Sequence, residues 1–275
     1  MVSTRGVNVD GEYVNEARVA AVYNTPKAPT WMVAVKELGQ MWQVDYSDLD
    51  NLRIEMINTN KYLHDGFFDP SQRYFQIAAN ASNRMEFQDT VTRKAVGSLV
   101  TGKKPHPGPG ANWDDPTCGP VAGTTHLGEG KVTVWGNDPK GRADMAWKTC
   151  YSVESDGPGL FIRTHPKSDY VIFDQTKHPD PEVQQAIKVL DKKTGKIVKT
   201  IQVTDQETAL ATHIEFNQDG SEFWVSVWVR GGKKNWSKGE IVVYDTKTLK
   251  EKARIKGFYA PTGKFNVTNR SDHVT

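Results

Sequence analysis

Three of the seven histidines lie in short stretches rich in glycine and proline. They read Leu63-His64-Asp65-Gly66, Pro105-His106-Pro107-Gly108 and Thr125-His126-Leu127-Gly128. Imidazole is the side chain most easily protonated near neutral pH, and it is also a common metal ligand. Turns built from Gly and Pro can hold such a ring at the edge of a cavity. These residue types allow proton transfer or ligand binding, although a single loop histidine is more often an ordinary surface residue.

Short strands that are aromatic or β-branched and bounded by turn residues recur along the chain and must position these rings. The predicted strands are 31–35, 40–46, 74–79, 84–89, 132–135, 170–173, 186–190, 196–201, 222–228, 240–245 and 251–255. Segments 64–75 and 213–224 align with each other, which predicts equivalent positions for His64 and His213. Four short strands at a period of about 40–50 residues are typical of a β-propeller blade. The sequence therefore predicts an all-β propeller with about five four-stranded blades in a partial ring.

Charge and composition exclude several classes of function. Lys plus Arg number 35 against 33 for Asp plus Glu, so the formal charge of +2 argues against a nucleic-acid partner. No apolar run approaches the ~20 residues of a membrane span, and the first residues form no export signal. Cys118 and Cys150 could form a disulfide or remain two buried thiols. No Cys-x-x-Cys-His stretch is present, so this chain attaches no c-type haem.

The candidate constellation combines His64, His106 and His213. In a propeller, residues from several blades converge on one end of the channel, where three imidazoles could serve a metal-bound ligand or deliver protons. We expect no bare metal site, because the sequence has no His-x-x-x-His or Cys-x-x-Cys spacing. A serine hydrolase is also disfavoured, since no Gly-x-Ser-x-Gly elbow occurs. Three aromatic residues near the histidine-bearing modules would suit a large flat cofactor or pack between blades: Trp113, Phe161 and Trp228.

Longer motifs add a family resemblance. They are Leu63-His-Asp-Gly66, Pro105-His-Pro-Gly-x-Gly-Ala-Asn112, Gly119-Pro-Val121, Thr125-His-Leu-Gly128, Leu160-Phe-Ile-x-Thr-His-Pro166, Val225-Ser-Val-Trp228 and Pro261-Thr-Gly-Lys-Phe-Asn-Val267. The chain resembles the haem d1 domain of the cytochrome cd1 family from about Ser3 to its end, so residues 1–275 are expected to be one haem d1-type domain. That family's domain is an eight-bladed propeller, and this chain resembles its C-terminal portion.

The resemblance implies a nitric-oxide-forming nitrite reductase of denitrification. Haem d1 would lie in the channel, with its axial His on an early blade outside this chain, and haem c is expected only on a missing N-terminal domain. His64 and His106 match the distal histidines that hydrogen-bond nitrite and donate protons. The matched pocket positions are Phe161, Trp228, Thr262 and Gly263, with Trp113 as a further candidate. The resemblance also implies a periplasmic location, a homodimer, and a c-type cytochrome or cupredoxin as electron donor.

Two departures from the family pattern keep other functions open. Pro109 stands where the family has an Arg that pairs with a haem d1 carboxylate, and His213 stands where the reductases tend to carry Gln. A titratable ring at position 213 would suit a dihydro-haem d1 dehydrogenase of d1 biosynthesis, which is the first alternative. The second alternative is a non-catalytic propeller scaffold or a truncated fragment.

Overall fold

Twenty strands form five antiparallel sheets of four strands each, described for residues 2–258 in a computed structural model. Each sheet is a meander in which strands consecutive in the chain are neighbours, and the sheets are termed blades 1 to 5. Blade 1 contains β3 (Val19–Asn24), β4 (Thr30–Val35), β5 (Gln40–Asp45) and β6 (Arg53–Asn58). Blade 2 contains β7 (Leu63–Phe68), β8 (Tyr74–Ala79), β9 (Arg84–Asp89) and β10 (Lys94–Val100). Blade 3 contains β11 (Pro105–Asp115), β12 (Gly119–His126), β13 (Lys131–Gly136) and β14 (Thr149–Glu154).

The last two blades follow the same plan. Blade 4 contains β15 (Ile162–Thr164), β16 (Tyr170–Asp174), β17 (Ala186–Asp191) and β18 (Lys196–Gln202). Blade 5 contains β19 (Ala209–Phe216), β20 (Glu222–Val229), β21 (Gly239–Asp245) and β22 (Glu251–Phe258). Two short strands, β1 (Gly6–Val7) and β2 (Tyr13–Val14), pair before blade 1, and a one-turn helix α1 (Pro181–Gln184) interrupts blade 4.

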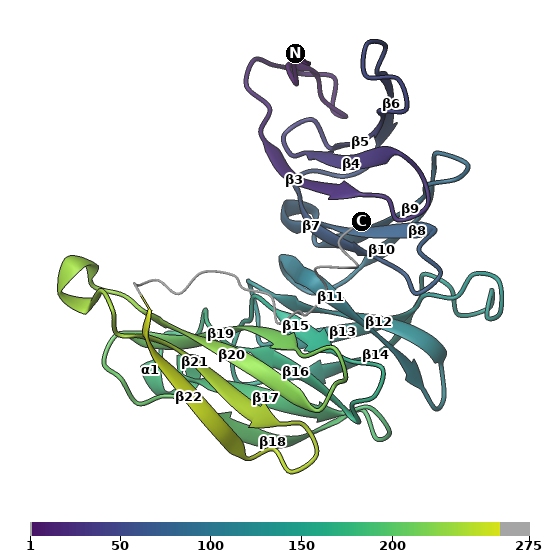
Figure 1. Cartoon of the computed structure of the whole chain (residues 1–275). Helices are drawn as coiled ribbons and strands as arrows, with labels where there is room; N and C mark the ends of the chain where they lie inside the picture. The colour runs from purple at the N-terminus through teal and green to yellow at the C-terminus, as the bar shows by residue number, and fades with distance from the viewer. Residues whose placement is uncertain (1, 259–275) are drawn as a thin grey trace.

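The blades follow one another in an open arc (Figure 1). The first strand of each blade lies on the inner side of this arc and packs against the first strand of the next blade. Within residues 2–258, no strand of blade 1 pairs with a strand of blade 5. The predicted all-β propeller arc of about five four-stranded blades is therefore confirmed.

Burial along each blade explains why the sequence shows the middle strands so clearly. All six residues of β8 are buried, because neighbouring blades cover both of its faces. The outermost strand β10 of the same blade is mostly exposed and reads Lys-Ala-Val-Gly-Ser-Leu-Val. Apolar side chains from adjacent blades meet in shared clusters, such as the one joining Ile172 of blade 4 to Val225 of blade 5. Blade-to-blade packing therefore forms the core.

The inner strands that carry histidines are irregular. The pairing register shifts between Leu63 and Gly66 in β7, between His106 and Ala111 in β11, and between Thr212 and Ile214 in β19. Such bulges bend a strand and re-aim its side chains, and they are frequent next to active sites. The histidines were predicted to lie in Gly- and Pro-rich turns, which is wrong. They lie within strands: His64 in β7, His106 in β11 and His126 at the end of β12. In β11 the bulge accommodates the prolines and the left-handed Gly108 and Gly110.

Cys118 and Cys150 form a disulfide. It joins the turn between β11 and β12 to the outer strand β14 of the same blade. The sequence left pairing and free thiols as alternatives, and the structure has the pair. Across residues 2–258, none of the helices has the length and apolar character needed to cross a bilayer.

Candidate functional site

His64 and His106 face each other on adjacent inner strands. Their ring centroids are 4.9 Å apart, and the rings are tilted by 45°. His106 is 4% exposed, whereas the His64 side chain is 34% exposed, so one ring is buried and the other reaches solvent. The sequence predicted that these two imidazoles share one cavity at the channel, and the structure brings them together on the concave side of the arc.

Asp65 links the two rings. Its Oδ1 lies 3.2 Å from His64 Nδ1, and its Oδ2 lies 3.3 Å from His106 Nε2. The carboxylate is nearly buried, so its charge acts on both imidazoles through little solvent. Two consecutive residues, His64 and Asp65, contact His106 because the β7 bulge opposes both of them to one residue of β8. Asp65 was not among the site residues predicted from the sequence.

The loop that precedes β15 fixes the other nitrogen of His106. His106 Nδ1 lies 2.6 Å from the carbonyl oxygen of Leu160, so this nitrogen carries the proton and donates it. Phe161, the next residue, meets the His106 ring edge-on, with centroids 5.9 Å apart and an interplanar angle of 89°. A Cβ at Gly108 would lie 2.5 Å from the Phe161 ring, so the glycine is needed for this contact. The ring of His106 is therefore oriented from both sides.

His213 lies beyond Phe161, whose ring centroid is 5.1 Å from the His213 ring centroid. His213 sits in the β19 bulge with a left-handed φ of 52°, and its Nε2 lies 3.2 Å from Glu215 Oε1. Glu215 Oε2 in turn accepts a hydrogen bond of 2.5 Å from Arg163. His64, His106, Phe161 and His213 thus form one row of rings across blades 2 to 5, here termed the ring row.

The predicted equivalence of His64 and His213 is off by one residue. Phe68 pairs with Phe75 in blade 2, and Phe216 pairs with Phe223 in blade 5. Counting back from these pairs through each bulge, His213 corresponds to Asp65 rather than to His64. The two segments are equivalent when shifted by one residue, which the similar strand patterns of the two blades did not reveal.

Asp174 anchors the second half of the ring row. Its Oδ1 accepts hydrogen bonds from the backbone N–H of Leu160 at 2.6 Å and of Phe161 at 3.3 Å. Its Oδ2 accepts from the Thr212 hydroxyl at 2.7 Å and from the His213 N–H at 3.4 Å. Asp174 is fully buried, and burial raises its pKa to about 6 despite these donors. One carboxyl group thus ties together backbone from blades 4 and 5 where the rings are presented.

Tyr23 of β3 brings blade 1 to the same place. Its hydroxyl oxygen accepts a hydrogen bond of 3.1 Å from the N–H of Gly66. Burial, together with the negative charge of Asp65, raises the pKa of Tyr23 to about 12, so it stays a neutral phenol. Tyr23 was not among the site residues predicted from the sequence, because a single tyrosine in a strand does not indicate which residue it contacts.

His126, the third histidine of the initial set, is a structural residue. It is fully buried at the end of β12, where Nδ1 lies 2.9 Å from the Lys131 carbonyl oxygen and Nε2 accepts from the Gly102 N–H at 2.9 Å. Burial lowers its pKa to about 4, so the ring is neutral near pH 7.

The predicted cofactor-binding residues are distributed unequally. Phe161 belongs to the ring row, and Trp228 lies on β20 directly behind the inner strand, paired with Leu210. Trp228 Nε1 is buried and has no hydrogen-bond partner among residues 2–258. Trp113 is not brought together with the ring row, because it packs in the cluster between blades 3 and 4 with its ring against Gly123. Thr262 and Gly263 lie outside the described residues.

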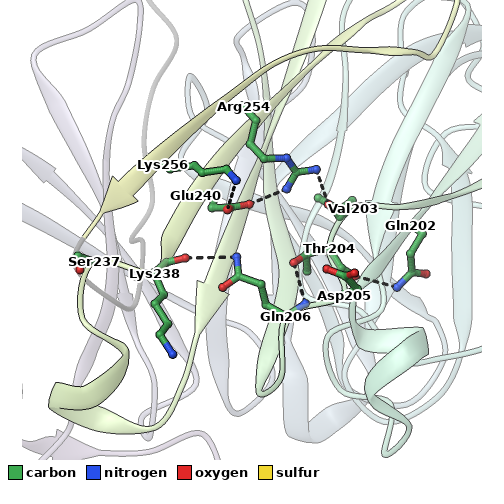
Figure 2. Close-up of a pocket in the computed structure, with 10 residues that line it drawn as sticks. All are labelled: Gln202, Val203, Thr204, Asp205, Gln206, Ser237, Lys238, Glu240, Arg254 and Lys256. Carbon is green, nitrogen blue, oxygen red and sulfur yellow. Dashed lines mark hydrogen bonds and ion pairs between the residues drawn. The ribbon is translucent and has the colours of Figure 1, made fainter.

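A cavity of about 690 Å³ lies elsewhere, between the segment after β18 and strands β21 and β22 (Figure 2). Arg254 bonds Glu240 at 2.6 Å and the Val203 carbonyl oxygen at 2.9 Å, and Lys256 lies 3.8 Å from the same Glu240. Arg254, Lys256 and Glu240 in this cavity therefore neutralise one another. None of the predicted site residues lines the cavity.

The whole chain has known relatives. The family model of the cytochrome D1 heme domain matches residues 1–270. A nitrite reductase from Stutzerimonas stutzeri is 41% identical over 291 residues, covering 100% of this chain and 51% of that protein. A dihydro-heme d1 dehydrogenase from Pseudomonas aeruginosa is 29% identical over 258 residues, covering 92% of this chain and 47% of that protein.

A solved structure supports the same family assignment. The dihydro-heme d1 dehydrogenase NirN in complex with DHE superposes with a TM-score of 0.75 at 27% identity, covering 96% of this chain and 51% of that one. The chain spans about half the length of the curated relatives it matches. The resemblance predicted from the sequence motifs is thereby confirmed. The chain belongs to the cytochrome D1 heme domain family.

Proposed function

We propose that this chain binds haem d1 on the concave side of its arc and takes part in the reduction of nitrite to nitric oxide. The observation that carries the proposal is the His64–His106 pair, two imidazoles 4.9 Å apart on adjacent inner strands. The nitrite reductase relative, 41% identical across the whole chain, supports the same assignment.

The residues on the inner side fit a large flat macrocycle. The ring row offers aromatic faces and edges to such a group. Gly108 and Gly110 have φ values of 58° and 74°, and a Cβ at either would clash with Phe161 or Phe67, so the backbone here stays free of side chains. The Trp228 Nε1–H, buried without a partner among residues 2–258, is a donor for a carboxylate or carbonyl of the cofactor.

The two histidines supply the protons. Reduction of nitrite to nitric oxide consumes one electron and two protons and releases water; bound haem d1 would supply the electron and an iron to bind nitrite. His106 commits Nδ1–H to the Leu160 carbonyl, so the proton it can transfer is the one at Nε2, beside Asp65. His64 is the more exposed ring, so it can take a replacement proton from water. Asp65 lies 3.2 Å from His64 Nδ1 and 3.3 Å from His106 Nε2, so its two oxygens orient both rings.

The dihydro-haem d1 dehydrogenase is the second candidate, and His213 favours it. The His213 imidazole contacts Phe161 and has Glu215 at 3.2 Å, which is the arrangement of a base oriented by a carboxylate. Phe161 separates His213 from His106, so His213 would act at a different edge of the macrocycle from the nitrite-facing pair. The relative from Pseudomonas aeruginosa, at 29% identity, supports this alternative.

The periplasmic location implied by the family resemblance is consistent with the disulfide. Structural disulfides persist in oxidising compartments such as the bacterial periplasm, so the Cys118–Cys150 bond supports a periplasmic location. We propose a c-type cytochrome or a cupredoxin as electron donor, and a homodimer for the full-length protein.

One experiment separates the two candidates. The purified protein is loaded with haem d1 or with its dihydro precursor, and His213→Gln is compared with the wild type. Nitric oxide formation that survives in His213→Gln, with no change in precursor absorbance, supports nitrite reduction. Precursor oxidation that is lost in His213→Gln supports the dehydrogenase instead. Failure of both loaded forms to react contradicts a catalytic role.

A further inference from the structure

We propose that His64, Asp65 and His106 form a binding site for a divalent transition-metal ion, with Zn²⁺ as the representative ion. Their ligand atoms lie within 4.8 Å of one another. The sequence predicted no metal site because no short His or Cys spacing exists, and His106 is remote from His64 and Asp65 in the chain. These three residues are termed the His–Asp–His cluster.

The spacing within the cluster matches that of metal ligands. Zinc sites have bonds of about 2.0–2.2 Å, which places adjacent ligand atoms of a tetrahedron roughly 3.3 Å apart. The two nitrogen–oxygen separations are 3.2 Å for His64 Nδ1 to Asp65 Oδ1 and 3.3 Å for His106 Nε2 to Asp65 Oδ2. Each Asp65 oxygen therefore lies at that spacing from one imidazole nitrogen, and the ligand atoms of all three residues lie within 4.8 Å of one another.

One nitrogen of His106 is held as it is in many metal ligands. Nδ1 donates to the Leu160 carbonyl oxygen at 2.6 Å, and metal-binding histidines commonly donate their second ring N–H to a backbone carbonyl in this way. Nε2 is the nitrogen left for an ion, and it lies 3.3 Å from Asp65 Oδ2, so the geometry allows both atoms to coordinate one cation.

The chemistry and exposure of the cluster select the class of ion. Two imidazoles and one carboxylate favour Zn²⁺, Cu²⁺ or Fe²⁺, whereas Ca²⁺ and Mg²⁺ prefer sites made of oxygen alone. Asp65 and His106 are 8% and 4% exposed, so they form the dry base of the site. The His64 side chain is 34% exposed, which leaves an entry path and a position for water.

The metal site also predicts an effect on nitrite reduction, and this prediction rests on the proposed function. An ion on His64 and His106 would occupy the nitrogens that are proposed to deliver protons to nitrite. Zn²⁺ should therefore inhibit nitrite reduction without removing the haem. Metal binding itself does not depend on the haem and can be measured in its absence.

The test is titration of the untagged, haem-free protein with Zn²⁺ by calorimetry, together with Cu²⁺ electron paramagnetic resonance to count nitrogen ligands. We expect one ion per chain, two coordinated nitrogens, and affinities about tenfold or more lower in Asp65→Asn and in His106→Ala. The matched controls are Asp114→Asn, an exposed aspartate on β11, and His178→Ala; both should bind like the wild type. Circular dichroism melting checks that each variant is folded.

Two outcomes would overturn the metal site: absence of a bound ion in the folded wild type, or an unchanged affinity in Asp65→Asn. The second arm adds Zn²⁺ to the haem-loaded enzyme. If Zn²⁺ binds the cluster but leaves nitrite turnover intact, the metal site is supported and the proton-delivery role is contradicted. If no ion binds while His106→Ala abolishes turnover, the proposed function is supported and the metal site is overturned.

Discussion

His106 and His126 lie on paired strands of one blade, one residue apart in register, and they have opposite environments. Pro105 of β11 pairs with His126 of β12, and His106 pairs with Thr125. Both rings are buried, and both stand in Gly-rich sequence. His126 uses its two nitrogens on Lys131 and Gly102 backbone, whereas His106 uses one on backbone and directs the other at Asp65 and His64.

The difference comes from the position of each strand in the blade. β12 is a second strand, covered on both faces, so a polar ring there must satisfy itself with nearby backbone. β11 is an inner strand with a long bulge, so its ring can be presented to the concave side of the arc. Residue type, burial and local composition are alike for His106 and His126. The bulge in β11 and the contact with the neighbouring blade give the two rings different roles.

The largest expected effect is on catalysis. In the haem-loaded protein, His106→Ala and His64→Ala should each lower nitrite turnover by about 10²–10⁴-fold, because a positioned proton donor contributes that much. Haem content should stay close to that of the wild type, since neither ring is the proposed axial ligand. Stopped-flow absorbance and pyridine haemochrome content measure the two quantities. Equal turnover in both variants and the wild type would remove the pair from proton delivery.

His126→Ala should show the opposite pattern, a large loss of stability. The change removes a buried ring and leaves the Gly102 N–H and the Lys131 carbonyl unpaired, which costs roughly 3–5 kcal/mol. His126→Gln, which keeps polar atoms near both partners, should recover part of that loss. Urea unfolding measures the free energy of unfolding of each variant. An unchanged free energy of unfolding in His126→Ala would contradict the structural role of His126 that sets it apart from His106.

Asp174→Asn should destabilise the protein by about 2–3 kcal/mol near pH 5, because an amide cannot accept from all four donors around Asp174. The folded-state pKa of Asp174 is raised to about 6, above its ordinary value of 3.8. Protonation therefore stabilises the wild-type fold fully below pH 3.8, and this contribution is lost as the pH rises through about 6.

The wild type should accordingly lose part of its advantage over Asp174→Asn between about pH 4 and pH 6. Thermal melts of both proteins across this range measure the difference in stability. An advantage that grows with pH would show that Asp174 is held as a carboxylate instead.

The smallest effect is expected at Pro109, which lies inside the β11 bulge. Pro109→Arg introduces the residue type that the family resemblance predicts against a haem d1 carboxylate, and it should tighten haem binding by several-fold, about 1 kcal/mol. Asp114→Asn serves as a control for a change of charge on the same strand. Haem titration followed by absorbance gives the dissociation constants of the wild type and of both variants. Weaker binding in Pro109→Arg would indicate that the bulge, not the missing charge, sets the affinity.

Much of the fold could be predicted because the middle strands carry uninterrupted apolar runs. Strands such as β8 and β9 have the predicted bounds, 74–79 and 84–89. β11 could not be predicted, since Pro107, Gly108, Pro109 and Gly110 read as a turn, yet they form the bulge of an 11-residue strand. The bulge interrupts the hydrogen bonds to the neighbouring strand, so a proline without an N–H removes no hydrogen bond there.

The candidate site was predictable only in part. His64 and His106 were found because motif and spacing agreed. Asp65, Asp174 and Tyr23 were not, because their importance lies in contacts between blades: Asp174 accepts from Thr212, 38 residues away. Such partners depend on how the blades stack, which the strand pattern of a single chain does not specify.

The most direct test of the central claim is a crystal structure of the haem d1-loaded protein with nitrite bound. We predict that nitrite oxygens lie within about 2.6–3.2 Å of nitrogens of both His64 and His106, with Phe161 against the macrocycle and His126 still bonded to Lys131 and Gly102. A macrocycle bound away from the inner strands, or a nitrite that contacts neither histidine, would contradict the account.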